Sequence, residues 1–344
     1  MRAVVQDHYG SPSDLRCVDL PVPRLGDDEV LVRVRAASVH PDVWHVVTGR
    51  PAALRLMGGG VRRPKQPVPG TDFAGEVVAV GSDVSTVGVG DDVFGETLPS
   101  MQWVNGATWA EFVAVQQDRL LTMPAGLTHE QACTLPTAGI IALQAVREQA
   151  QVSPGQQVLV NGAAGGVGSL SVQIAKADGA TVTAVDDADK QDLLRALGAD
   201  HVIDFTRDDF TRGDARYDVV VDIPGNHPFS EIRRALAPHG RYVLVGHDQY
   251  GREGRRVLGS IPRMVGLMAR SAVTDQIPRG SFRSRPKLDY LRALAELAEA
   301  GHVRPVVGRT FSLEEAGAAL EHLASGRALG RVVLTPAGGA DSGR

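Results

Sequence analysis

The chain has 344 residues, of which 43% are apolar and 22% are charged, and its net charge is -4. This is the composition of a globular protein of about two domains, and so small a charge predicts no nucleic acid partner. The two cysteines, Cys17 and Cys133, exclude a disulfide scaffold and a four-cysteine zinc site. No run of about 18 apolar residues predicts a membrane span, and the first residues lack the pattern of a signal peptide, so we expect a cytoplasmic protein.

The first 120 or so residues are predicted to be rich in β-strands. Runs of alternating or continuous apolar residues occur at 29–39, 73–84, 91–96 and 109–121, and Gly and Pro separate them. Short strands at this spacing are typical of a small barrel or sandwich.

The pattern changes near residue 125. Residues 127–150 have helical spacing, and Thr128 with Gln131 predicts a capping box at its start. Strands and helices then alternate, with strands expected at 156–162, 181–186, 201–205, 217–223 and 241–246 and helices at 165–179, 188–198 and 228–240. This rhythm predicts an α/β domain with a doubly wound parallel sheet.

Residues 247–286 interrupt the rhythm, and such a segment is usually a lid, an interface or a loose loop. They contain an amphipathic stretch at 261–273, which we expect to be a packed helix, an apolar cap over a substrate or a dimer surface. The arginines around it would face solvent or attract an acidic substrate. Helices at 287–301 and 312–326 and strands at 303–311 and 331–336 complete the chain.

The strongest functional signal is a glycine-rich loop after the strand at 156–162. It contains Gly162, Ala163, Gly165, Gly166, Val167 and Gly168, in the order NGAAGGVG from Asn161. Gly165 and Gly168 take the second and third places of a GxGxxG fingerprint, and Ala163 takes the first. Glycine lets the backbone approach a pyrophosphate, and the helix that follows offers unpaired N–H groups. The loop therefore predicts a dinucleotide site.

Asp186 ends the next strand and bears on the choice of dinucleotide. An acid at this place pairs with the ribose hydroxyls of NAD and repels the 2′-phosphate of NADP. Asp187 adds negative charge, whereas Lys190 could pair with that phosphate or face solvent. We expect NAD(H) to be favoured, with NADP(H) possible.

Several landmarks together resemble the zinc-independent, quinone oxidoreductase-like branch of the medium-chain dehydrogenases/reductases. They are ASVHPDVW, VPGTDFAGEVVAVG, GDDVFGE, LPTAGIIALQAV, NGAAGGVGSLSVQIAKADGA, LGADHVIDF and LGRVVL, and together they cover almost the whole chain. The resemblance implies a Rossmann-type doubly wound sheet domain at 125–286, inserted into a GroES-like β-barrel domain formed by 1–124 and 287–344. It also implies a homodimer formed through the edge of the Rossmann sheet.

Zinc-dependent relatives hold a catalytic metal with a cysteine, a His-Glu pair and a second cysteine. At the matching places this chain has His40, Thr71-Asp72 and Thr134, with Cys133 beside the last. A tetrahedral site needs at least three converging protein ligands, so His40, Asp72 and Cys133 would have to form an unusual set. We therefore expect no zinc, and no alcohol oxidation assisted by a metal.

The resemblance places His40, Asp42, Trp44 and Thr71 in the catalytic region. His40 stands where the family usually has asparagine, and it could donate to a substrate carbonyl, protonate an enolate or only pack. Asp42 is either the acid that follows the proline in the family or a helix-start acid. Trp44 is expected in a pocket wall or, more readily, in the core, and His45 in solvent or, less readily, in the cleft.

The resemblance also implies further contacts with the cofactor. Thr137 precedes the helix behind the nicotinamide, and Asp222 and Gly225 follow a strand whose carboxyl end faces ligands. Gly246 would lie beside the ribose, and Arg331 resembles the basic residue that closes over the cofactor. Ordinary capping, plain turns and a solvated arginine are the competing interpretations.

These features predict an NAD(P)H-dependent oxidoreductase that transfers a hydride to a small quinone or α,β-unsaturated carbonyl. His40 and residues 247–286 also admit a specialised biosynthetic enoyl reductase or a redox-neutral pathway enzyme on the same fold. A third hypothesis is a non-catalytic member of the family that binds dinucleotide or RNA.

Overall fold

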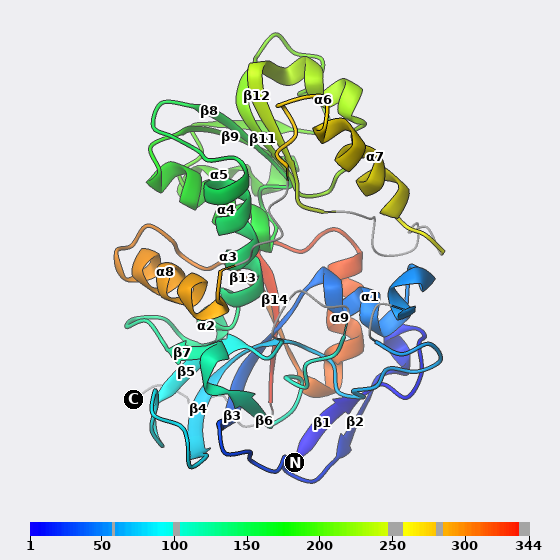
Figure 1. The fold of residues 1–344 in the computed structure, drawn as a ribbon, viewed down its shortest axis with the longest axis vertical. Helices are drawn as coiled ribbons and strands as arrows, with labels where there is room; N and C mark the ends of the chain where they lie inside the picture. The colour runs from blue at the N-terminus through cyan, green and yellow to red at the C-terminus, as the bar shows by residue number, and fades with distance from the viewer. Residues whose placement is uncertain (57–58, 99–103, 247–256, 280–284, 337–344) are drawn as a thin grey trace.

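Two β-sheets organise the chain, one in the upper and one in the lower half of the view in Figure 1. The computed structural model describes residues 1–56, 59–98, 104–246, 257–279 and 285–336. The blue N-terminal strands and the red C-terminal strand both belong to the lower half, whereas the green middle of the chain forms the upper half (Figure 1). The ends of the chain therefore share one half of the molecule, and the middle forms the other.

The lower sheet has the strand order β13-β14-β3-β4-β5-β7, and β6 pairs with β3. Its strands are β3 (Glu29–Val39), β4 (Asp72–Val80), β5 (Asp92–Glu96), β6 (Phe112–Gln116), β7 (Leu120–Thr122), β13 (Val307–Ser312) and β14 (Arg331–Thr335). A separate antiparallel pair is formed by β1 (Arg2–Val5) and β2 (Arg16–Asp19). Strand β14 runs antiparallel to β3, with Val333 opposite Ser38, so the last segment completes the sheet that the first segment begins.

The upper sheet has the order β10-β9-β8-β11-β12, and all of its neighbours are parallel. Its strands are β8 (Gln157–Asn161), β9 (Thr181–Asp186), β10 (His201–Asp204), β11 (Tyr217–Asp222) and β12 (Leu236–Leu244). The chain moves outward from β8 in one direction and then continues on its other side with β11. Ligands of such sheets bind at the carboxyl ends of the strands, where the order reverses. The predicted doubly wound parallel sheet is confirmed.

Helices cover both faces of the upper sheet, whereas α1 and α9 pack in the lower half (Figure 1). The helices are α1 (Pro41–Thr48), α2 (His129–Ala132), α3 (Pro136–Leu143), α4 (Gly166–Ala177), α5 (Gln191–Ala196), α6 (Phe229–Ala235), α7 (Ile261–Ser271), α8 (Lys287–Glu299) and α9 (Ala316–Ala324). The predicted capping box of Thr128 and Gln131 is present at the start of α2. Both α1 and α3 begin at a proline, which is favourable in a first turn because its missing N–H would have no partner there.

Three predicted elements are wrong in extent. The helix expected at 127–150 is interrupted, because Pro136 starts a new helix and residues Gln144–Gln149 adopt a π-helical turn. The helix expected at 228–240 ends at Ala235, and the chain from Leu236 onward extends β12. Pro238 disfavours a helical residue before it and removes a helical donor, which accounts for this early end.

The strand expected at 109–121 is divided into β6, a 3-10 turn at Gln117–Arg119 and β7. Helix α1 was anticipated only by the interpretation of Asp42 as a helix-start acid; Pro41 begins it and Gly49, with a φ of 60°, ends it.

Helix α7 occupies the amphipathic stretch after 260. The predicted helix is present, but its apolar side is only partly packed. Leu267 is its buried residue, whereas Met264 and Met268 are 44% and 60% exposed. Of residues 247–286, where a lid, an interface or a loop was expected, 247–256 and 280–284 lie outside the described residues.

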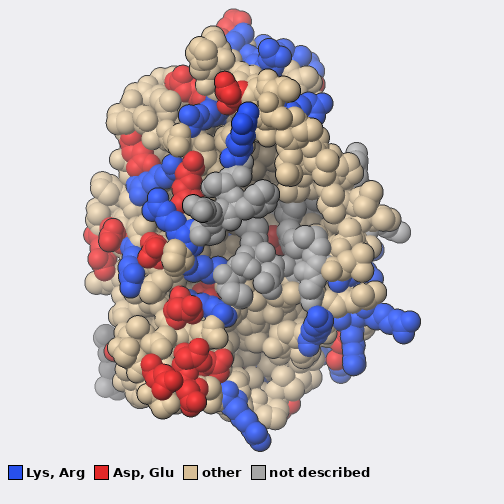
Figure 2. All heavy atoms as spheres, in the orientation of Figure 1, with Lys and Arg blue, Asp and Glu red and all other residues tan. Residues whose placement is uncertain are grey.

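The largest apolar core extends across both halves, from Ala74 and Phe94 of the lower sheet to Val158 and Val182 of the upper, and each half has a further core of its own. The central strands β8 and β11 contain continuous apolar runs, Val158–Val160 and Val219–Val221, because helices cover both faces of the upper sheet. Across the ranges given above, no helix is long and apolar enough to span a membrane. On the face drawn in Figure 2, Lys and Arg side chains are interspersed with Asp and Glu, in keeping with a net charge of -4.

Candidate active site

The glycine-rich loop joins β8 to α4 at the carboxyl edge of the upper sheet, and all of its predicted residues lie there. Gly162 has a φ of 77°, a left-handed conformation that favours glycine. A Cβ atom on Gly168 would lie 2.1 Å from the carbonyl oxygen of Gly162, so only glycine allows this close approach. Gly165 is the N-cap of α4, and no side chain caps this helix end. The helix N-terminus is therefore suited to bind an anion.

Asp186, at the end of β9, supports this loop from the side. Its Oδ2 atom accepts from the N–H of Ala164 at 2.8 Å, and its Oδ1 atom accepts from Nζ of Lys190 at 2.9 Å. Lys190 also lies 3.4 Å from the carboxylate of Asp187. Burial alone would lower the pKa of Lys190, but the hydrogen bond and charge of Asp186 raise it. The alternative that Lys190 is solvated is wrong, because its ammonium is buried between two carboxylates.

Arg331 reaches the same loop from the lower half of the molecule. The N–H of Gly330 donates to the carbonyl oxygen of Ala164 at 2.7 Å, and Gly330 forms a parallel bridge with Gly165. The Arg331 side chain is 5% exposed, and a Cβ atom on Gly166 would lie 2.6 Å from its Nε atom. The alternative that this arginine is solvated is therefore wrong, and its guanidinium lies against the N-terminus of α4.

Asp222 braces the loop that follows β11. Its Oδ1 atom accepts from Nδ2 of Asn161 at 2.9 Å and from the N–H of Gly225 at 3.0 Å, and its Oδ2 atom accepts from the hydroxyl of Tyr242 at 2.9 Å. Asp222 thus positions Gly225. A Cβ atom on Gly246 would lie 1.6 Å from the carbonyl oxygen of Ile223, so these two segments approach each other as only glycine permits.

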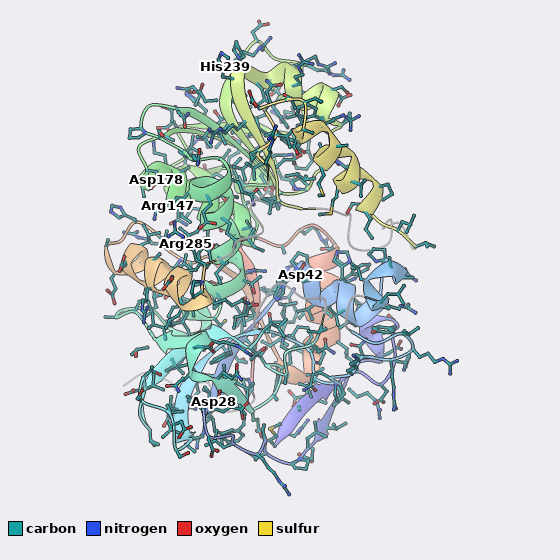
Figure 3. All side chains as sticks on the ribbon, viewed as in Figure 1. Asp28, Asp42, Arg147, Asp178, His239 and Arg285 are labelled. Atoms are coloured by element: carbon teal, nitrogen blue, oxygen red, sulfur yellow. The ribbon has the colours of Figure 1, made fainter. Side chains whose placement is uncertain are left out.

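A cavity of about 750 Å³ lies between the two halves, and side chains from both line it. Its polar lining includes His40, Asp42, Thr71, Glu96, Thr137 and Lys287. Asp42 on α1 and Arg285, just before α8, are labelled in Figure 3 and also line it. The volume is within the usual range of small-molecule sites.

A buried carboxylate, Asp72 at the start of β4, lies at the centre of the polar groups beside the cavity. It accepts from the Oγ atom of Ser38 at 3.1 Å and from Oγ1 of Thr71 at 3.0 Å. It also accepts from the N–H of Thr137 at 3.2 Å and from its Oγ1 at 2.5 Å. Nε2 of His40 lies 2.8 Å from Oγ1 of Thr71, so the imidazole extends this set. Burial lowers the pKa of His40, although the Asp72 and Asp42 carboxylates oppose this.

Glu96 and Lys287 form a buried ion pair on another part of the wall, at 2.5 Å. Glu96 ends β5 and Lys287 begins α8, and their side chains are 8% and 13% exposed. Burial raises the pKa of Glu96 to about 7, against the opposing effect of the Lys287 ammonium. Neither residue was predicted to be functional, and the only local sign is that the landmark GDDVFGE ends in an acid.

Comparison with known proteins identifies the family. An alcohol dehydrogenase GroES-like domain model matches residues 26–125, and a zinc-binding dehydrogenase model matches residues 197–334. The chain is 32% identical to 2-methylene-furan-3-one reductase of Solanum lycopersicum, over 98% of this chain and 79% of that one. It is 31% identical to an NAD-dependent alcohol dehydrogenase of Sulfurisphaera tokodaii, over 98% and 100% of the two chains. The quinone oxidoreductase structure from Coxiella burnetii has a TM-score of 0.80 at 30% identity, covering 97% of this chain and 99% of that one. The chain belongs to the quinone oxidoreductase-like family of medium-chain dehydrogenases/reductases.

This quinone oxidoreductase-like protein therefore combines a GroES-like domain with a Rossmann dinucleotide-binding domain. Membership makes it an NAD(P)-binding oxidoreductase. The predicted boundaries near 124 and 286 remain a prediction.

The family includes zinc enzymes, but the residues at the metal place do not fit a zinc ion. Asp72 already accepts four hydrogen bonds, and Sγ of Cys133 lies 3.3 Å from the carbonyl oxygen of Glu130. Burial raises the pKa of the Cys133 thiol well above its usual range. Among the residues that the structure describes, no three His, Cys, Asp or Glu side chains are grouped as metal ligands would be.

Trp44 and His45, two aromatic residues of α1 near the site, are buried within the protein. Trp44 is 4% exposed and packs in the apolar core of the GroES-like domain. His45 is 2% exposed, and its Nδ1 atom lies 2.6 Å from the carbonyl oxygen of Arg50, so the expectation that it faces solvent is wrong. Both residues belong to α1 and anchor this helix, and Asp42 on the same helix lines the cavity.

Proposed function

We propose that this protein is a zinc-independent reductase that uses a nicotinamide dinucleotide, NAD(H) by preference, to reduce a quinone or an α,β-unsaturated carbonyl. The observation that carries the proposal is the set of hydrogen bonds around Asp72. In it, His40, Thr71 and Thr137 occupy the wall of the cavity as hydrogen-bonding groups, and the carboxylate of Asp72 accepts four hydrogen bonds. The names of the tomato reductase and the Coxiella oxidoreductase support the same substrate classes.

The cofactor would be held by residues at the edge of the Rossmann sheet. The N-terminus of α4 and the glycine-rich loop would bind its pyrophosphate, with Arg331 against the same helix end. Asp186 and Asp187 would face the adenine ribose, and Lys190 is held between them, which supports NAD(H). When bound, the nicotinamide supplies the hydride.

The remaining chemistry is the delivery of a proton to the reduced acceptor. Glu96 lines the cavity and has a pKa of about 7, so it holds a proton in a substantial fraction of molecules near neutral pH. The Lys287 ammonium fixes its carboxyl group and stabilises the carboxylate that remains after transfer. We assign Glu96 as the proton donor and Lys287 as the residue that positions it.

We retain three further predictions as proposals. The protein would be a homodimer, for which β12 offers a free edge among the described strands of the upper sheet. It would be cytoplasmic, and its partner would be a small molecule rather than a nucleic acid or a membrane.

The test is consumption of NADH and NADPH with a panel of quinones and enones, in EDTA and with added zinc, next to a panel of alcohols with NAD+. We expect turnover of at least one quinone or enone that EDTA leaves unchanged, and a protein free of zinc by elemental analysis. Alcohol oxidation that EDTA abolishes and zinc restores would refute the proposal. Dinucleotide binding without turnover of any acceptor would instead favour the specialised pathway enzyme or the non-catalytic member of the family.

A further inference from the structure

The hydrogen bonds of His40 fix which of its ring nitrogens carries the proton. Oγ1 of Thr71 has one hydrogen, and it donates that hydrogen to Oδ1 of Asp72 at 3.0 Å. A carboxylate is a stronger acceptor than an imidazole, so this direction is favoured. Thr71 can then only accept from Nε2 of His40, at 2.8 Å. The imidazole is therefore protonated at Nε2, and its Nδ1 atom presents a lone pair.

That lone pair is unused among the described residues. The Nδ1 atom of His40 is buried and has no hydrogen-bond partner there, and His40 itself is 3% exposed. Oδ2 of Asp42, which is also an acceptor, lies 3.7 Å from it. Both residues line the cavity. A buried acceptor without a donor costs about 1 to 3 kcal/mol, so the site as built favours a ligand that brings a donor.

We propose that Nδ1 of His40, together with Oδ2 of Asp42, binds a hydroxyl group of the substrate, so that the enzyme is selective for hydroxylated quinones or enones. This inference rests on the proposed reductase function and deepens it. A carbonyl oxygen cannot take this place, because it would face two acceptors. His40 is thus a hydrogen-bond acceptor, which opposes the hypothesis that it donates to the substrate carbonyl.

The rest of the cavity supplies the opposite kind of group. Lys287 carries N–H donors, and Glu96 carries a proton in its neutral form. A substrate with a carbonyl oxygen at one end and a hydroxyl at the other would satisfy both parts of the wall. The distance between the two polar parts of the cavity therefore determines which distance between carbonyl oxygen and hydroxyl a substrate must have.

The kinetic test uses matched pairs of acceptors, hexenal with γ-hydroxyhexenal and cyclopentenone with γ-hydroxycyclopentenone. We expect kcat/KM to be about 10- to 100-fold higher for the hydroxylated member of at least one pair. His40→Phe, which removes the acceptor, should abolish this preference. Thr71→Val removes the partner of Nε2 and should also abolish it, because the proton then moves to Nδ1. His129→Phe is the control, since this imidazole pairs with Asp92 outside the cavity and should leave the preference unchanged.

A second measurement does not depend on turnover. Nitrogen NMR of protein labelled with nitrogen-15 in its histidine rings reports which ring nitrogen is protonated. The signals of His40 are assigned by comparison with His40→Gln. We expect a protonated Nε2 and a bare Nδ1 in the wild type, the reverse in Thr71→Val, and a change at Nδ1 when γ-hydroxyhexenal but not hexenal is added without cofactor. A protonated Nδ1 in the wild type, or equal kinetics for both members of both pairs, overturns the inference. If no acceptor is reduced at all, the proposed function fails, and the response of Nδ1 to the two ligands still decides whether His40 binds a hydroxyl.

Discussion

Replacement of Glu96 by glutamine should change how the stability of this protein depends on pH. The pKa of Glu96 is raised from 4.5 to about 7, mainly by burial. The fold therefore favours the protonated form, so this contribution to stability is complete below pH 4.5 and is lost as the pH rises through 7. Over the whole titration the free energy of unfolding falls by about 3 kcal/mol, and between roughly pH 5.5 and 8.5 it falls by about 2 kcal/mol. Glutamine does not titrate in this range. The free energy of unfolding of Glu96→Gln should therefore rise relative to that of the wild type by about 2 kcal/mol between these two pH values.

The assay is urea denaturation of both proteins at the two pH values, followed by tryptophan fluorescence and by circular dichroism. Only the difference between the two pH values is used, so any constant cost of leaving Lys287 without its carboxylate cancels. Glu76→Gln is the matched control, because Glu76 pairs with Arg35 at 2.9 Å but both side chains are about one-third exposed. We expect its pH-dependent difference to stay below about 0.5 kcal/mol. The free energy of unfolding of Glu96→Gln minus that of the wild type should rise with pH. A value that does not vary with pH, or that falls as the pH rises, would show that the carboxyl group is not buried as described.

Four further predictions follow from the site. Reductase activity should fall as the pH rises through about 7, because Glu96 must be protonated to donate, and a pH profile of Glu96→Gln should lose this limb together with about 100-fold or more in kcat. Asp186→Ser releases Lys190 and should raise the ratio of kcat/KM with NADPH to that with NADH by about 10-fold or more, and an unchanged ratio would contradict the assignment of these residues. Gly168→Ala places a Cβ 2.1 Å from the Gly162 carbonyl oxygen, and we expect about a 10-fold or greater loss of NADH affinity by fluorescence titration, with circular dichroism as the check on folding. Asp72→Asn replaces one acceptor oxygen by a donor among four donors, which should lower the free energy of unfolding by about 2 to 4 kcal/mol in urea.

Local patterns predicted the parts of the site that depend on neighbours in sequence. The dinucleotide loop could be predicted because its glycines, the strand before it and the helix after it lie within one short segment. The same holds for the capping box at Thr128, where both partners are three residues apart. Elements were wrong where proline competes with helical periodicity, as at Pro136 and Pro238.

Contacts between distant segments could not be predicted in this way. Glu96 and Lys287 are far apart in the sequence, and only the packing of α8 beside β7 and the 3-10 turn at Gln117–Arg119 brings them together. The burial of Lys190 and His45 likewise depends on what packs over them, because both are polar residues that a sequence pattern assigns to the surface. The function of His40 depends on the direction of two hydrogen bonds, which no residue pattern encodes.

The carboxylate of Asp72 joins the two domains at one point, because it belongs to β4 of the GroES-like domain and accepts both the N–H and the hydroxyl of Thr137 at the start of α3. The N–H of Gly330 joins the same domains at another place, where it donates to the carbonyl oxygen of Ala164, so an opening of the cavity by relative rotation must break at least one of these contacts or leave both in place as a hinge. A chimera that exchanges the Rossmann domain for that of a relative would keep both hydrogen bonds of Asp72 only if the incoming helix also has a threonine or serine at the place of Thr137.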